Sequence, residues 1–560
     1  MSTVPVARPR RSGARSLARD LSSSVVRLHA AFEAAALPLD LSSISTVREE
    51  RGRVIAQVDD YVLPRLAGLD GPALVVVGGP TGAGKSTLVN SLTGQRVTTP
   101  GLLRPTTRSP VLAHHPADRE WFGPDRVLPS LDRVDRPTTS RDALQLVETT
   151  AVPRGVALLD APDFDSIDDA NRELATKLLA AADLLLFVTS AARYSDQVPW
   201  LQLSLALERQ TTVAVVMNRV PADDMATVSS HLATMLRATA VPADQMFFVE
   251  EGVVDGQGIL PAHHLTGLRR WLDALAADSA ARSAAVRHSV RGAIRRAVAA
   301  APSVAEAATL QVQAVSELLA VADRVYAGTA DALRGALADG TLVRGDLVAQ
   351  WLDLVGDLDP ATAPDLVTDL RRRLPGRDAD RAARVDRLGV ALDIALETLL
   401  VDHAAQAAEA ASTELKATAH GSALLDWSTD DLTRPGRGLA SQARKVIRAW
   451  RQRFAARVAL ELGTDPAADV ERDMLAIALV LRAASARDGH RPDEPDDVTT
   501  LVDAARDGLV RALTALLAED RDRYLQPVLE WNLAPDAPAR LRAAADDAAR
   551  TLAQHERQGA

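Results

Sequence analysis

A glycine-rich octapeptide, GPTGAGKS at positions 79–86, constrains the fold of this chain more than any other feature. It fits the spacing G-x-x-x-x-G-K-[ST], in which backbone N–H groups surround phosphate oxygens, a lysine meets the β- and γ-phosphates, and a hydroxyl ligates Mg²⁺. Its glycines allow backbone dihedrals that a Cβ forbids, so that successive amides point at one anion. The predicted phosphate-binding residues are Gly79, Pro80, Thr81, Gly82, Ala83, Gly84, Lys85, Ser86 and Thr87.

The residues on either side of the octapeptide have the context that a phosphate-binding loop requires. The run 73–77, ALVVV, is apolar and β-branched and predicts a buried parallel strand. Residues 88–92 continue as a helix whose positive end faces the same anion. Lysine is rare in the chain, which otherwise uses arginine for positive charge. An ammonium group at Lys85 therefore indicates a specific role in phosphate binding.

Composition excludes several classes of function. The 560 residues are enough for a nucleotide-binding domain and at least one further domain. The chain has no cysteine, which excludes disulfides, thiolate catalysis and cysteine-ligated zinc. A net charge of −10 argues against a general nucleic-acid partner. We find no run of about 18 apolar residues and therefore predict no transmembrane helix.

The order of patterns along the chain predicts four regions. Residues 1–15 have the composition of a disordered basic tail, and 16–70 hold two helical patterns, at about 17–36 and 46–66. Alternating strands and helices in 71–280 predict an α/β domain with a mainly parallel sheet. Residues 281–560 show only helical spacing and predict an all-α bundle or stalk.

Within the α/β domain, short apolar runs predict the strands, and their carboxyl ends predict the ligand edge of the sheet. After 73–77, the predicted strands are 111–113, 156–160, 184–188, 213–217 and 246–249. A helix is predicted near Asp142 to Val147. Asp160 ends one of the strands, and Asn218-Arg219 directly follows another.

This order of motifs resembles the dynamin-like branch of the P-loop GTPase superfamily, most closely the dynamin-family proteins of actinobacteria. The resemblance depends on Lys85-Ser86, the sequence RPTT at 104–107, DAPD at 160–163 and NRVP at 218–221. It is specific over roughly 72–275. It implies a P-loop GTPase domain flanked by helices that transmit nucleotide-driven motion.

Carried over residue by residue, the resemblance implies that Lys85 and the loop amides hold the phosphates of GTP. It implies that Ser86, Thr107 and Asp160 hold Mg²⁺, with Thr106 the less favoured switch threonine. Asn218, with Arg219 beside it, would contact the guanine base. The implied catalytic residues are Lys85 and Thr107, because phosphoryl transfer depends mainly on positioning and charge stabilisation. Thr81 and Gly82 stand where eukaryotic dynamins carry polar residues that position the catalytic water and a cation, a departure for which Thr81 is expected to substitute in part.

Two further departures from the family pattern leave alternatives open. The third residue after Asp160 is Asp163, where the family has a glycine that senses the γ-phosphate. The third residue after Asn218 is Pro221, where an aspartate ordinarily reads guanine. The predicted function is GTP binding with slow hydrolysis, coupled to conformational change or self-assembly. A nucleotide-gated scaffold with little hydrolysis and a P-loop ATPase remain as alternatives.

The segment 434–457 is a second feature, in which arginines alternate with apolar residues that include Trp450 and Phe454. It predicts either a bundle helix whose cations meet acidic neighbours such as 488–497, or a basic amphipathic helix on an anionic membrane. Nucleic-acid binding is the least favoured of the three interpretations. The expected location is cytoplasmic, or peripheral at the inner face of the plasma membrane. The expected partner is a second copy or a related dynamin-like protein.

Overall fold

The computed structural model describes most of the chain, and its residues form two compact units. The described residues are 11–42, 44–98, 109–166, 168–195, 197–208, 211–237, 241–373, 379–418, 420–464, 468–485 and 495–559. Unit 1 lies within Met1–Leu37, Ser43–Thr309 and Ala534–Ala560, and unit 2 within Pro38–Ser42 and Leu310–Leu533.

Unit 1 contains, among its described residues, an eight-stranded sheet in the order β3-β4-β2-β5-β1-β6-β7-β8. The strands are β1 (Ala73–Gly78), β2 (Val111–His114), β3 (Asp132–Val134), β4 (Ala143–Glu148), β5 (Val156–Asp160), β6 (Leu184–Ser190), β7 (Thr212–Val220) and β8 (Met246–Glu250). Neighbouring strands are parallel except for β2 and β5. Every residue of β1, β5 and β6 is buried, as is usual for parallel strands covered on both faces. The prediction of a mainly parallel α/β domain is confirmed.

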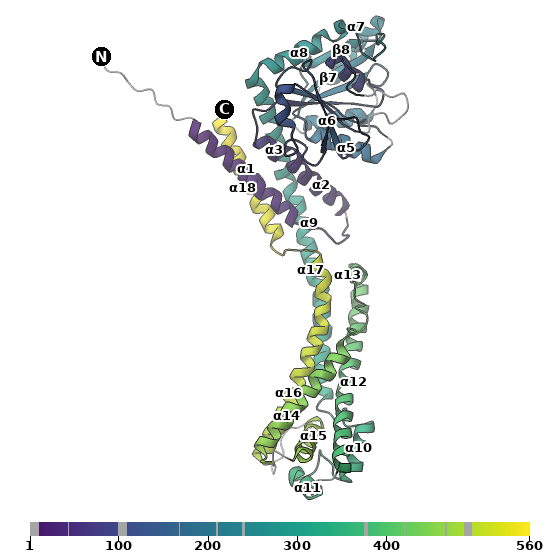
Figure 1. Cartoon of the computed structure of the whole chain (residues 1–560), viewed down its shortest axis with the longest axis vertical. Coiled ribbons are helices and arrows are strands. Elements are labelled where there is room, and N and C mark those ends of the chain that lie inside the picture. Colours follow the sequence, from purple (N-terminus) through teal and green to yellow (C-terminus); the bar gives the residue numbers. More distant parts are fainter. Residues whose placement is uncertain are drawn as a thin grey trace, which may run out of the picture. The chain divides into compact units, whose positions relative to one another are not determined.

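Helices cover this sheet and extend beyond it. They are α1 (Arg11–Ala34), α2 (Ile44–Gln57), η1 (Val58–Val62), α3 (Leu63–Leu66), α4 (Lys85–Thr93), η2 (Pro116–Phe122), α5 (Asp169–Ala180), α6 (Gln197–Glu208), η3 (Ala222–Asp224), α7 (Met225–Leu236), η4 (Ala243–Gln245), η5 (Ala262–Leu265), α8 (Thr266–Ala277), the first part of α9 (Ser279–Ala336), and α18 (Ala537–Gly559). The first and last of these, α1 and α18, lie side by side, and Arg27 pairs with Asp547 at 2.6 Å (Figure 1). The two ends of the chain therefore belong to the same unit.

A buried carboxylate, Asp183, joins the helices before the sheet to the sheet itself. The residue is 0% exposed and forms an ion pair with Arg65, which is 3% exposed. Its carboxylate also accepts hydrogen bonds from the Tyr61 hydroxyl at 2.9 Å and the Leu74 amide at 2.7 Å. Its backbone carbonyl accepts from Ser289 Oγ of α9 at 2.9 Å. One residue thus connects η1, α3, β1 and α9 at the start of β6.

Unit 2 is helical throughout its described residues, as the sequence predicts. It contains the second part of α9, α10 (Gly345–Val355), α11 (Leu366–Arg373), α12 (Ala379–Ala417), α13 (Gly421–Trp427), α14 (Leu439–Glu461), α15 (Asp469–Ser485), α16 (Asp496–Arg521), η6 (Asp522–Tyr524) and α17 (Leu525–Glu530) (Figure 1). Its larger apolar core lies between α10, α12, α14, α15 and α16. Residues Met474 to Leu481 of α15 are all buried, which agrees with their continuous apolar sequence.

One described helix, α9, is long and apolar enough to cross a membrane by length and composition. Of its most apolar window, 44% is buried within the structure. Core helices of soluble proteins have the same properties.

The helix predicted near Asp142 to Val147 is wrong, because residues 143–148 form β4. This strand pairs in parallel with β2 on one side and with β3 on the other. Its first three residues are buried, and the Gln145 amide donates to Pro110 O at 3.0 Å. The open backbone edge of β2 determines the conformation of this segment, and local propensity is overridden.

Candidate functional site

The predicted phosphate loop connects the end of β1 to the start of α4 at Lys85. At two positions of this loop the structure has no room for any residue but glycine. Gly79 has φ +156°, and a Cβ there would lie 1.9 Å from the carbonyl oxygen of Val188. Gly84 has φ +91°, and a Cβ there would lie 2.3 Å from Asn218 Nδ2. The loop is therefore enclosed by β6 and β7, and side chains at these positions would displace it.

Lys85 lies inside this loop and is 4% exposed. Its Nζ donates to Gly79 O at 2.9 Å, to Pro80 O at 3.0 Å and to Asp163 Oδ1 at 2.5 Å. An ammonium has three donors, and all three are used. A phosphate that approaches Lys85 must replace one of these acceptors, and Asp163 is the only charged one among them.

Ser86 and Asp160 lie together at the end of β5. Ser86 Oγ donates to Asp160 Oδ2 at 2.7 Å. The other oxygen, Asp160 Oδ1, is buried and has no hydrogen-bond partner among the described residues. Burial raises the pKa of Asp160, while Ser86, the charge of Lys85 and the nearby hydroxyl of Thr98 oppose that shift. A hydroxyl and a buried carboxylate are suitable ligands for Mg²⁺ and its water shell.

Thr81, in the middle of the loop, is held by two residues that sequence analysis did not identify. Its amide and its hydroxyl both donate to Asp165 Oδ1 at 2.6 Å. Its carbonyl accepts from Arg193 Nη1 at 2.7 Å, and Arg193 Nη2 lies 3.1 Å from Asp165 Oδ2. Burial raises the pKa of Asp165, but the hydrogen bonds from Thr81 and the charge of Arg193 outweigh it, so that the pKa lies below its usual value.

Asn218 lies at the end of β7, against the phosphate loop. Its Nδ2 donates to Ala83 O at 2.8 Å, and its Oδ1 accepts from the Arg219 amide at 3.0 Å. Arg219 has φ +54°, is exposed, and lies where the pairing of β7 with β8 is irregular. Asn218 thus supports the loop that holds Lys85. A contact of Asn218 or Arg219 with a guanine base stays a prediction.

The structure brings most of the predicted site residues together. Lys85, Ser86, Thr81, Asp160 and Asn218 all lie at the carboxyl edge of β1, β5 and β7, around the loop 79–84. Thr106 and Thr107 lie outside the described residues. No group of three or more His, Asp or Glu side chains suited to a metal occurs in the described part of the chain.

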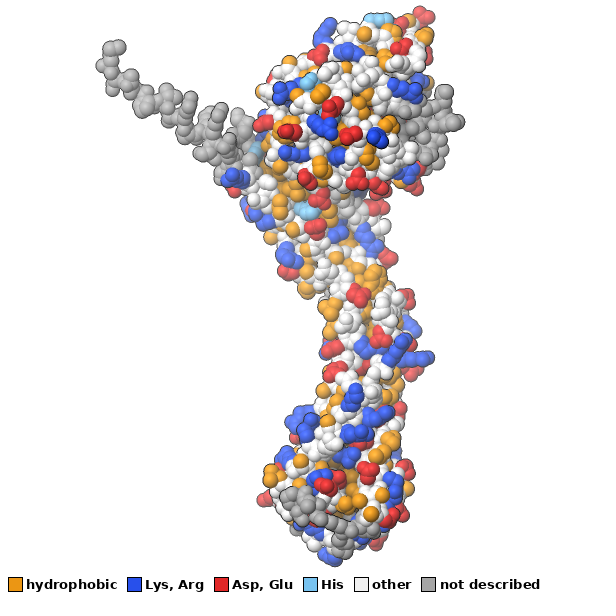
Figure 2. Space-filling model, in the orientation of Figure 1, with side chains coloured by type: hydrophobic (Ala, Val, Ile, Leu, Met, Phe, Trp, Pro, Cys, Tyr) orange, Lys and Arg blue, Asp and Glu red, His pale blue; other side chains and the backbone are white. Residues whose placement is uncertain are grey.

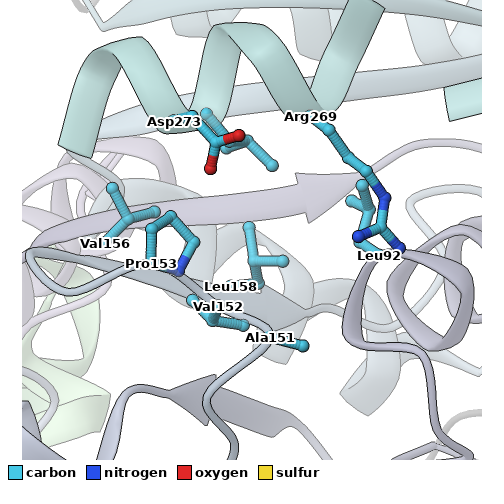
Figure 3. Close-up of a pocket in the computed structure, with 9 residues that line it drawn as sticks. Leu92, Ala151, Val152, Pro153, Val156, Leu158, Arg269 and Asp273 are labelled. Carbon is cyan, nitrogen blue, oxygen red and sulfur yellow. The ribbon is translucent and has the colours of Figure 1, made fainter. Parts of the chain in front are cut away.

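A small cavity elsewhere in unit 1 does not belong to this site. It lies between α8 and β5 and has a volume of about 40 Å³ (Figure 3). Arg269 and Asp273 of α8 border it opposite Val156 and Leu158. This volume accommodates a water molecule but no nucleotide.

The segment 434–457 belongs to unit 2, and many of its side chains make contacts there. Ile447, Trp450 and Phe454 of α14 are buried in the core. Arg444 forms a bidentate pair with Glu397 at 2.7 and 2.8 Å, and Arg451 one with Asp393 at 2.8 and 3.0 Å. The acidic partners that the structure shows for these two arginines are on α12, whereas most of 488–497 lies outside the described residues. On the face shown in Figure 2, basic and acidic side chains are interspersed.

These features define a P-loop nucleotide-binding domain: a buried strand leads through a glycine-rich turn into a helix that begins at the lysine. A carboxylate lies at the end of the neighbouring strand of the sheet. Residues 74–219 match the family model of the 50S ribosome-binding GTPase. The match includes Lys85, Ser86, Asp160 and Asn218. The predicted P-loop GTPase domain is thereby confirmed for this part of the chain. A comparison with curated proteins finds no match.

Solved structures with similarity to the chain include three kinds of protein. A single-residue variant of Era of Aquifex aeolicus, bound to GDP·AlF₄⁻, is 18% identical over 32% of this chain and 50% of its own, with a TM-score of 0.22. The chain thus spans about half the length of Era. A structure of an oligomerised bacterial dynamin pair is 10% identical over 94% of this chain and 97% of its own, with a TM-score of 0.33. Toc33 of Arabidopsis thaliana, with Mg²⁺ and GMPPNP, is 15% identical over 45% and 97%, with a TM-score of 0.24. Because these TM-scores are low, the assignment of a P-loop GTPase domain rests on the family model that matches residues 74–219.

Proposed function

We propose that this chain is a dynamin-like protein that binds GTP with Mg²⁺, hydrolyses it slowly, and couples the nucleotide to conformational change or self-assembly. The observation that carries the proposal is the cluster of Lys85, Ser86 and Asp160 inside the region that matches a GTPase family model.

In this proposal, different groups of the chain bind the phosphates and the metal. The amides of the loop 79–84 and Lys85 bind the phosphates, and Ser86 and Asp160 hold the metal. Mg²⁺ held by these residues would neutralise negative charge that develops on the phosphates. Asn218 holds the loop in place through Ala83 O, and its neighbour Arg219 is exposed. In the proposal these two residues contact the base.

Slow hydrolysis follows from the contact between Lys85 and Asp163. A carboxylate 2.5 Å from the lysine competes with the phosphates and brings negative charge to the place where the γ-phosphate would lie. The same contact favours the second candidate function, a nucleotide-gated scaffold that binds GTP with little turnover. A P-loop ATPase is the third candidate, because Pro221 replaces the residue that ordinarily reads guanine.

The contacts of Asp183 support the proposed coupling of nucleotide binding to the helices of unit 1. This residue connects η1 and α3 to β1, and α9 to the start of β6, within unit 1. A shift of β1 or β6 on nucleotide binding would thus reach these helices through buried polar contacts. Self-assembly, or association with a related dynamin-like protein, is part of the proposal.

Membrane association is proposed at the inner face of the plasma membrane, through exposed cations of α14. Lys445 and Arg448 are exposed and form no ion pair among the described residues, whereas the apolar side of the helix is buried. The contact would therefore be electrostatic, at about 1 kcal/mol per cation. Replacing both residues by glutamate should abolish sedimentation with anionic vesicles at low salt. Unchanged sedimentation would rule out this surface.

The catalytic part of the proposal is tested by phosphate release from GTP over a range of protein concentrations. Lys85→Ala should remove turnover, and Lys416→Ala, at an exposed lysine of α12, should leave it unchanged. A specific activity that rises with concentration supports the assembling GTPase. Tight GTP binding without turnover supports the scaffold, and equal turnover in Lys85→Ala contradicts the proposed site.

A further inference from the structure

A second cation borders the phosphate loop in addition to Lys85. Arg193 lies in the turn that follows β6, and its amide donates to Ser190 O at 2.9 Å. Its guanidinium donates to the carbonyl of Thr81, next to Pro80, whose own carbonyl accepts from Lys85. Lys85 and Arg193 therefore bind consecutive carbonyls of the same loop.

Each of these cations is matched by an aspartate of the segment after β5. Asp163 pairs with Lys85 at 2.5 Å, and Asp165 pairs with Arg193 at 3.1 Å. Two carboxylates, two residues apart, thus occupy the two cations that border the loop. A triphosphate brings several negative charges into the same space and competes with both carboxylates for the same partners.

We propose that Arg193 is a catalytic residue, an arginine supplied from within the chain to the γ-phosphate; this inference rests on the proposed GTPase function. Asp165 pairs with Arg193 while Arg193 donates to Thr81 O. Phosphate binding at Lys85 displaces Asp163, the neighbouring Asp165 moves with the same segment, and the released guanidinium binds γ-phosphate oxygens. The side chain of Arg193 is 32% exposed, so it is not locked in a core.

The step that Arg193 would assist is hydrolysis of the γ-phosphate. A water oxygen forms a bond to the γ-phosphorus while the bond from that phosphorus to the β–γ bridging oxygen breaks. The electron pair of the broken bond stays on the oxygen of GDP, and the proton of the water leaves with inorganic phosphate. Charge accumulates on the transferred group and the bridging oxygen, where a planar guanidinium with several donors binds best.

The test separates ground-state binding from transition-state binding in the full-length protein. Arg193→Met and Arg193→Lys are compared with Arg270→Met, at an exposed arginine of α8. Affinity for a fluorescent GMPPNP analogue, retention of GDP in the presence of aluminium fluoride, and single-turnover phosphate release are measured. Arg193→Met should keep GMPPNP affinity within about threefold, lose retention of GDP with aluminium fluoride, and slow release about 10²- to 10³-fold. Arg193→Lys should recover part of the rate.

Outcomes for this inference and for the proposed function are distinguishable. If Arg193→Met retains GDP with aluminium fluoride and turns over like wild type, Arg193 only positions Thr81 and the inference is overturned. If wild type binds no guanine nucleotide, the proposed function fails and the inference with it. Asp165→Asn serves if Arg193→Met does not fold. It removes a carboxylate that competes with the phosphates, so it should bind GMPPNP more tightly and keep the aluminium fluoride complex. Loss of that complex in folded Asp165→Asn would overturn the inference.

Discussion

Replacing Asp163 with asparagine should make the protein less stable without nucleotide and tighter in binding GTP. In wild type the carboxylate is one of three acceptors around the buried ammonium of Lys85. Asparagine is nearly the same size and keeps an oxygen, but it removes the charge. The two effects have opposite signs because Asp163 occupies the lysine only while phosphate is absent.

The size of both effects follows from one contact. A hydrogen bond to a charged group contributes about 1.5–3 kcal/mol. The contact in question is buried at both ends, with side chains 4% and 8% exposed, so we take about 2–3 kcal/mol as the loss in the free energy of unfolding. Wild type must break the same contact to bind a triphosphate, and the variant does not. Its affinity should therefore rise by about 30- to 150-fold, at 1.4 kcal/mol per factor of ten.

Two measurements on Asp163→Asn are sufficient. Urea unfolding without nucleotide gives the stability change, and titration with a fluorescent GMPPNP analogue in Mg²⁺ gives the affinity. GDP should gain less than the triphosphate, because it lacks the γ-phosphate whose charge meets Asp163. Asp169→Asn is the matched control, since Asp169 is 88% exposed and its pair with Arg172 should contribute little. An affinity for GMPPNP that is unchanged or weaker in folded Asp163→Asn would refute this reasoning.

Further predictions concern the fold, the metal site and the phosphate loop. Arg65→Ala leaves the Asp183 carboxylate buried without its cation and should cost about 3–5 kcal/mol in urea unfolding; a loss below about 1 kcal/mol would contradict the described network. Because burial raises the pKa of Asp160, protons compete with Mg²⁺, so Mg²⁺-dependent affinity for GMPPNP should fall as pH is lowered from 8 toward that raised pKa; a pH-independent Mg²⁺ requirement would exclude Asp160 as the group that titrates. The raised pKa has the reverse effect on the metal-free protein, whose stability falls as pH rises through it. Gly84→Ala should abolish nucleotide binding, since its Cβ would meet Asn218, whereas Gly328→Ala, in open space on α9, should raise stability by about 0.5–1 kcal/mol; equal nucleotide affinity in Gly84→Ala and wild type would show that the loop is less confined.

Most of the sheet could be predicted because its strands are buried on both faces. Continuous apolar runs mark β1, β5, β6 and β7 regardless of what they contact. The strands at one edge of the sheet, β3 and β4, were harder to predict. The strand β4 has only its first three residues buried, and β3 has only three residues, so that neither has a strong local pattern. Pairing with β2 determines the conformation of β4, and that partner lies about 30 residues earlier.

The candidate site was also predictable only in part. The phosphate loop was predictable, because the spacing of its glycines and Lys85 is local in sequence. Asp165 and Arg193 were not, since they are 84 and 112 residues from Thr81 and neither belongs to a motif. The only available signal was that each follows the end of a strand, β5 or β6, at the ligand edge. For α14 the apolar spacing was correctly recognised, but spacing alone does not say whether a core or a membrane covers that face.

The measurement that tests the central claim most directly is competition of GTP against ATP for a fluorescent guanine nucleotide on the purified chain with Mg²⁺. The predicted result is a clear preference for GTP, with binding lost in Lys85→Ala and kept in Lys416→Ala. Equal competition by ATP would contradict the GTP-binding function while leaving the P-loop domain intact. Binding that survives in Lys85→Ala would contradict the site itself.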